Sequence, residues 1–239
     1  TCDLLFTEIA RQYDARRGGV GCPAAAFGSY LDFITAEQAY LTSEECARDR
    51  DFWTAQLTPL PESPLPAAGR SSTGDPTAHS VTLSLPYAPI CALVACTRRA
   101  TPYLVVKAAL SLVLHRIGEK PRIAVGFAGH GRRTAALRRT GGMMVGTYAT
   151  ASDLEPHLGF AHVVQGVAER VRTAITSHGG YPFDRLVREI NASGNLFDVS
   201  IVGHAEKRKT AYRRRFYPPG VQSEALVVHV NIDQAHPTD

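Results

Sequence analysis

The sequence predicts an α/β fold, a mixed sheet flanked by helices, from three observations. Residues 1–58 carry apolar side chains at helical spacing. Residues 59–76 contain five prolines among serines and glycines, a composition typical of a linker. From residue 77 onward, short runs rich in Val, Leu and Ile alternate with helical patterns. Because alternating strands and helices build layered structures, the sheet is expected in this second part.

Three helices are predicted before the proline-rich stretch. In the first, Asp3–Arg17, apolar residues recur every four positions and share one face. Ser29 is the expected N-cap of the second helix. Thr42 and Glu45 stand at capping-box spacing ahead of the third, Cys46–Leu57. The residues expected on the apolar face of the first helix are Leu5, Ile9 and Tyr13.

The second part begins with a predicted strand, in which Val81, Leu83 and Leu85 alternate with polar residues. Thr101-Pro102 provides an N-cap and a first-turn proline for the helix Tyr103–Ile117. That helix is apolar nearly all round, so we expect it to be buried between layers. The remaining predictions are helices over Ile90–Arg98 and Leu158–Thr176 and after Pro182, and strands over Ile123–Ala128, Met143–Thr150, Leu196–Val202 and Ala225–Ile232.

Composition excludes some classes of protein. Of the 239 residues, 44% are hydrophobic and 20% charged, as in ordinary soluble domains. The sequence has no run near the ~18 apolar residues that a membrane-spanning helix needs. The five cysteines share no metal-binding or redox spacing, which favours small hydrophobic roles in a reducing, cytoplasmic setting.

The chain has a net charge of +4, and a cluster of basic residues lies near its C-terminal end. This cluster either forms a solvated face or docks an acidic partner by charge complementarity. Nucleic acid is a weaker interpretation, because no aromatic platform accompanies the basic residues. The candidate docking residues are Lys207, Arg208, Arg213, Arg214 and Arg215.

Motifs that would identify a catalytic or cofactor site are missing. No G-x-S-x-G elbow, Walker loop or G-x-G-x-x-G occurs, and none of the nine histidines has a carboxylate at metal-pair spacing. The sequence therefore predicts no catalytic residue, no metal ligand and no directly bound cofactor. His130, between Gly129 and Gly131, is the least ordinary histidine, since flanking glycines let a ligand approach the backbone.

Several longer segments, taken in order, resemble the condensation-domain family of nonribosomal peptide synthetases, part of the chloramphenicol-acetyltransferase-like superfamily. The resemblance covers Leu4 to Val187, and the final fifty residues match only loosely. The segments are Leu4-Leu5-x-x-Glu8-Ile9, Tyr30-x-Asp32-Phe33, Phe52-Trp53-x-x-x-Leu57, Leu114-His115-Arg116, Val125-Gly126 through Gly131-Arg132, Gly142-Met143-Met144-Val145-Gly146-Thr147, and His178-x-x-Tyr181-Pro182-Phe183-x-x-Leu186-Val187.

The resemblance implies a chloramphenicol-acetyltransferase-like two-layer lobe with a mixed sheet. Residues 1–58 are then helices that complete an N-terminal lobe and crossover, 59–76 the linker, and 77–239 a C-terminal lobe incomplete at its end. The family's His-His-x-x-x-Asp-Gly motif would end just before Thr1, and no Asp-Gly dipeptide occurs in the sequence. We therefore expect this chain to be inactive on its own.

In that family, a tunnel between two lobes admits phosphopantetheine arms of carrier proteins, where an amine attacks a thioester. The resemblance implies carrier domains and an adenylation domain as partners, with the phosphopantetheine carried by the partner. Small glycines leave room for such an arm, or else they mark a bulge or tight turn. Arg132 either has a structural role, which we favour, or meets substrate. The tunnel candidates are Gly126, Gly129, Gly131, Arg132, Val145, Gly146 and Thr147.

Alternatives remain open at this stage. Gly146 replaces the asparagine usual in the family's Val-Asn-Thr element. This departure gives weight to a non-catalytic module that binds carrier proteins. Epimerisation, cyclisation or another carrier-dependent acyl transfer are the other enzymatic interpretations.

Overall fold

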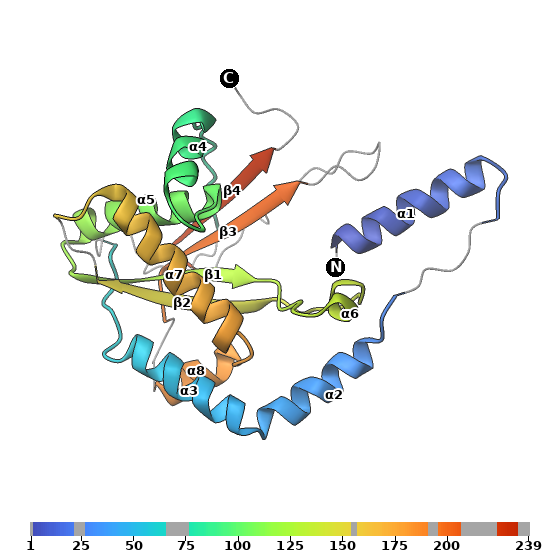
Figure 1. Ribbon diagram of the computed structural model, residues 1–239, viewed down its shortest axis with the longest axis horizontal. Coiled ribbons are helices and arrows are strands. Elements are labelled where there is room, and N and C mark those ends of the chain that lie inside the picture. The colour runs from blue at the N-terminus through green and yellow to red at the C-terminus, as the bar shows by residue number, and fades with distance from the viewer. Residues whose placement is uncertain are drawn as a thin grey trace.

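The computed structural model describes residues 2–21, 27–65, 77–153, 157–190, 196–206 and 224–233 (Figure 1). Its elements, in chain order, are α1 (Cys2–Arg17), α2 (Tyr30–Leu41), α3 (Glu44–Leu57), α4 (Tyr87–Cys96), α5 (Pro102–Gly118), β1 (Arg122–Gly129), α6 (Ala135–Arg138), β2 (Gly146–Asp153), α7 (Phe160–His178), α8 (Phe183–Glu189), β3 (Val199–Glu206) and β4 (Leu226–Asp233).

The four strands form one mixed sheet in the order β2-β1-β3-β4. β1 and β2 run antiparallel over eight residue pairs, whereas β1 with β3 and β3 with β4 are parallel. The centre of the sheet is buried, with Ile123, Val125 and Ile201 all 1% exposed or less. The predicted mixed sheet flanked by helices is confirmed.

Helices α5 and α7 lie side by side on one face of this sheet (Figure 1). α7 buries a stripe of small and branched side chains that follows the helical repeat. Thr101 caps α5 as predicted, its hydroxyl accepting a hydrogen bond from the backbone N–H of Leu104. The expected burial of α5 on all sides is wrong, because Val113 and Ile117 are more than half exposed. No described helix is long and apolar enough to cross a membrane.

Of the three N-terminal helices, α2 and α1 extend away from the sheet (Figure 1). α3 packs against α7, α8 and β2, whereas α1 stands apart from the body of the protein. The face of α1 predicted to be apolar is present but uncovered, with Leu5, Ile9 and Tyr13 exposed by 45%, 66% and 56%.

Three local predictions are wrong. Val81, Leu83 and Leu85 lie in an extended segment that is assigned to no strand, and their side chains are 84%, 79% and 58% exposed. The cap of α3 is Ser43, whose hydroxyl accepts from the backbone N–H of Cys46, because Thr42 still belongs to the end of α2.

The second strand starts later than predicted, at Gly146 instead of Met143. The segment before it is held by another contact, since the Tyr30 hydroxyl donates to the Met143 carbonyl at 2.8 Å. Of the expected linker, residues 66–76 lie outside the described residues. Its first part packs on the lobe, where Leu65 contacts the core.

Candidate functional site

At the adjacent ends of β1 and β2, predicted tunnel residues of the two strands lie next to one another. Gly129 pairs with Gly146, and Ala128 pairs with Thr147. The ring of Tyr148 lies across both glycines, because a Cβ atom at Gly129 or Gly146 would come within 2.7 Å or 2.4 Å of its atoms. At these two positions the absent side chain makes space for an aromatic ring of the protein itself.

Gly126 and Gly131 have different surroundings. A Cβ atom at Gly126 would lie 2.2 Å from the ring of Phe197, so this glycine also accommodates an aromatic side chain. Gly131 has a φ of 58°, the left-handed conformation of a turn, and sits against the Met144 carbonyl. The glycines thus serve ring packing and one turn in the lobe as it stands.

Val145 and Thr147 present their side chains outward. Val145 is 55% exposed, and Thr147 is exposed next to its partner Ala128 on β1, which is exposed as well. Tyr148 is buried and points to the α7 side. Successive strand residues alternate between faces, so Thr147 points away from α7. Of the seven candidates, these two have exposed side chains.

Arg132 holds the loop between β1 and β2 through backbone carbonyls. Its guanidinium donates to Leu137 at 2.6 Å, to Gly142 at 3.1 Å, and to Thr140. A planar guanidinium with five N–H donors is well suited to gather several carbonyls in this way. These bonds agree with the structural role favoured from the sequence.

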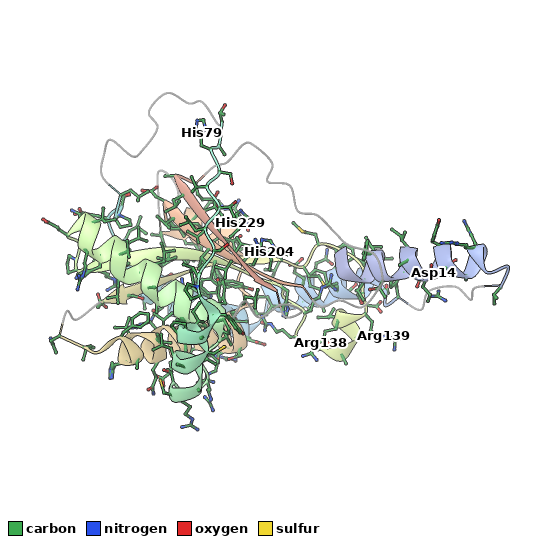
Figure 2. The ribbon with its side chains drawn as sticks, turned by 90° about the horizontal axis from the view of Figure 1, so that it is seen from above. Asp14, His79, Arg138, Arg139, His204 and His229 are labelled. Atoms are coloured by element: carbon green, nitrogen blue, oxygen red, sulfur yellow. The ribbon has the colours of Figure 1, made fainter. Side chains whose placement is uncertain are left out.

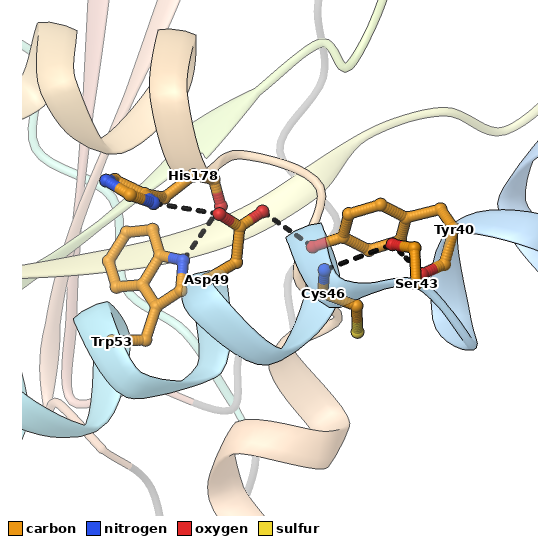
Figure 3. A network of polar contacts seen from close by, with 6 residues as sticks. All are labelled: Tyr40, Ser43, Cys46, Asp49, Trp53 and His178. Carbon is orange, nitrogen blue, oxygen red and sulfur yellow. Dashed lines mark hydrogen bonds and ion pairs between the residues drawn. The ribbon is translucent and has the colours of Figure 1, made fainter.

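A buried carboxylate joins α3 to the end of α7, a feature that sequence reasoning missed (Figure 3). Asp49 is 2% exposed and accepts hydrogen bonds from the Tyr40 hydroxyl at 2.6 Å and from His178 Nδ1 at 2.8 Å. The Trp53 indole donates to the His178 carbonyl at 2.9 Å. The His178 ring also stacks on Phe52, with centroids 3.8 Å apart.

Burial, and then the hydrogen bond to Asp49, raise the pKa of the Tyr40 phenol far above its usual range. The phenol therefore stays protonated and remains a donor to the carboxylate. The Tyr148 hydroxyl ties the same region to β2, donating to the Gly179 carbonyl at 2.8 Å. The network holds α3 against the end of α7 and against β2.

The sequence did contain a signal for this network. The buried residues of α3 are Cys46, Asp49, Trp53 and Leu57, which follow one helical stripe. A carboxylate on an apolar stripe requires a buried partner, because burying an unpaired charge is costly. The identity of that partner, 129 residues away, is not encoded in any local pattern.

The basic docking candidates Lys207, Arg208, Arg213, Arg214 and Arg215 lie outside the described residues. Their role stays a prediction from the sequence. Among the described residues, no three His, Cys, Asp or Glu side chains gather closely enough to form a metal site.

Comparisons with known proteins agree on one family. A family model described as Condensation domain matches residues 2–227. Fumosorinone synthetase of Cordyceps fumosorosea (strain ARSEF 2679) is 29% identical over 174 residues, which are 70% of this chain and 4% of that protein. A plipastatin synthase of Bacillus subtilis (strain 168) is 28% identical over 211 residues, 84% of this chain and 6% of that protein. The chain thus spans less than a tenth of the length of these relatives.

Solved structures give the same answer for the fold. The first condensation domain of the calcium-dependent antibiotic synthetase, in complex with a substrate analogue, superposes with a TM-score of 0.70 at 26% identity. That match covers 88% of this chain and 46% of the other. The starter condensation domain of rhizomide synthetase superposes with a TM-score of 0.71 at 17% identity, covering 98% of this chain and 54% of the other, and supports the fold alone.

Proposed function

The chain belongs to the condensation-domain family, and from this membership we propose that it forms part of a domain that makes amide bonds in a nonribosomal peptide synthetase. The amine of a carrier-bound aminoacyl group attacks the carbonyl of a carrier-bound acyl or peptidyl thioester. A C–N bond forms, the C–S bond breaks, and the phosphopantetheine thiol leaves with the amine proton. The observation that carries the proposal is the family match over almost the whole chain.

The lobe contributes positioning to this reaction. Holding amine and thioester together removes much of the entropic cost of a bimolecular step, worth up to ~7–11 kcal/mol in favourable cases. We assign the outward side chains of Val145 and Thr147 to the tunnel wall, with Arg132 and the Asp49 network behind them as supports. The 239 residues contain no His-His-x-x-x-Asp-Gly sequence, so we expect them to form no amide bond alone.

The test measures amide formation between loaded donor and acceptor carriers by mass spectrometry. We expect product from the whole domain in its natural context and none from residues 1–239 alone. In the whole domain, Val145→Trp should lower the rate on the order of tenfold, because misplaced reactants lose effective molarity. Val113→Trp, at an exposed valine of α5, is the matched control and should leave the rate unchanged.

Each result separates the alternatives. Product from residues 1–239 alone would contradict the expectation that this chain is inactive on its own. Carrier binding without product from the whole domain would favour the non-catalytic module. Equal rates for Val145→Trp and the control would show that Val145 does not line the tunnel. The proposed function would be unaffected by that result.

The basic cluster provides a second prediction, for carrier docking. Replacing Arg213, Arg214 and Arg215 by Glu should weaken binding of an acidic carrier protein about tenfold at low salt, and the difference should shrink as salt screens the charges. Titration of the carrier at two ionic strengths measures the effect. Charge reversal at Arg16, Arg17 and Arg98, which are exposed elsewhere, controls for net charge. Affinity lost equally in both variants would assign the effect to net charge and exclude a docking site.

A further inference from the structure

Two histidines on neighbouring strands lie together on the face of the sheet opposite α5. In the parallel register of β3 and β4, Val202 pairs with His229 and His204 with Asn231, so the two imidazoles are diagonal neighbours on one face. Tyr103 of α5 contacts the other face, where it packs on Gly203. Figure 2 shows His204 and His229 next to each other, with His79 further away.

The two rings are joined by a hydrogen bond between nitrogen atoms. His204 Nε2 and His229 Nδ1 are 3.0 Å apart, one donating and the other accepting, and the contact is exposed to solvent. The ring centroids are 5.3 Å apart with 22° between the planes. The neutral imidazole is the form of histidine that binds metals.

We propose that His204 and His229 form a two-imidazole site for a divalent transition-metal ion such as Cu²⁺ or Ni²⁺. Imidazole nitrogen is a suitable ligand for both ions. Metal–nitrogen bonds to histidine are ~2.0–2.1 Å long, so two nitrogens that already lie 3.0 Å apart can reach one ion with little movement of the strands.

Binding requires that the hydrogen bond between the two nitrogens breaks, so that both present a lone pair to the ion. Because the ring planes are nearly parallel, one imidazole rotates about χ2 to aim its lone pair at the ion, and terminal sp³–sp² torsions are broad enough to permit this. Exposure of the contact gives the ion access. The site is therefore one for exchangeable binding, and an occupied site ties β4, at the edge of the described sheet, to β3.

The experiment titrates residues 1–239 with NiCl₂ and CuSO₄ by calorimetry at pH 7.5, alongside His204→Gln, His229→Gln and the double variant. We expect each single substitution to weaken binding at this site on the order of tenfold or more. The metal should also raise the melting temperature of the unsubstituted chain, since only the folded state holds the pair. His162→Gln, at an exposed histidine of α7, is the matched control.

The outcomes are decisive in both directions. Binding and thermal shift that survive in the double variant would overturn the site, as would failure of the unsubstituted chain to bind either ion more tightly than the double variant does. Electron paramagnetic resonance of the Cu²⁺ form gives an independent readout. We expect coupling to two nitrogens in the unsubstituted chain and to one in each single variant, whereas unchanged coupling in the variants would contradict the assignment.

Discussion

Replacing Asp49 by alanine is expected to lower the free energy of unfolding by about 3 kcal/mol. The carboxylate is 2% exposed and accepts hydrogen bonds from Tyr40 and His178. Hydrogen bonds to a charged group contribute ~1.5–3 kcal/mol each, and their loss leaves two half-buried donors without this acceptor. The side chain of His178 is 23% exposed, so water can reach it. The loss of stability is therefore smaller than the sum of the two upper hydrogen-bond values.

Urea denaturation followed by circular dichroism measures this effect. Trp53, the single tryptophan of the chain, reports on the same region by fluorescence. Asp51→Ala is the matched control on the same helix, because the Asp51 side chain is 70% exposed and pairs only at the surface with Arg50. This surface substitution should change the free energy of unfolding by no more than ~0.5 kcal/mol. The stability of Asp49→Asn should lie between those of Asp49→Ala and Asp51→Ala, since the amide oxygen of asparagine still accepts a hydrogen bond. Equal stability of Asp49→Ala and Asp51→Ala would show that the network contributes nothing.

The Asp49 network also shows where sequence reasoning ends. Local signals predicted most elements correctly, because helix caps such as Thr101 and branched runs such as Ile123–Ala128 act over a few residues. The site depends on pairs distant in sequence, such as Asp49 with His178 and Gly126 with Phe197. No periodicity encodes those contacts, so sequence reasoning missed the Asp49 network, and the tunnel candidates stay a prediction.

The wrong strand prediction has a physical explanation of the same kind. The alternation of Val81, Leu83 and Leu85 has the period of a strand, yet a strand is stabilised by its neighbours on a ladder and by burial of one face. In the structure these side chains are exposed and the segment belongs to no strand. Alternation of apolar and polar residues therefore indicates that a segment can form a strand. Whether it does so depends on a neighbouring strand with which it can pair.

Lys107 provides the second large effect, and it concerns pH. This lysine of α5 is 1% exposed, donates to the Val125 carbonyl at 3.2 Å, and lies 5.0 Å from the centre of the Phe127 ring. Burial lowers its pKa to about 7. The unfolded chain, with a lysine pKa near ~10.4, binds more protons than the folded chain between these values, so stability rises with pH across that window.

Between pH 7 and pH 9 the difference in bound protons should add about 2 kcal/mol to the free energy of unfolding, at ~1.4 kcal/mol for each pH unit once the folded group is neutral. Lys107→Met removes the titrating group while it retains an unbranched apolar side chain. We expect this variant to be more stable than the unsubstituted chain at pH 7 and to lose that advantage progressively towards pH 10.

Guanidinium chloride unfolding at pH 7, 8 and 9 tests this expectation, and the comparison uses the difference between the two proteins. Other groups that titrate in this range are present in both chains and cancel in the difference. Lys120→Met controls for the loss of a positive charge, because Lys120 is 37% exposed and pairs with Glu62 at the surface. If Lys107→Met and the unsubstituted chain changed in parallel with pH, the amine would have to remain charged in the folded state. The Val125 carbonyl and the Phe127 ring would then stabilise the ammonium enough to offset its burial, and Lys107 would act as a buried cation that holds α5 on β1.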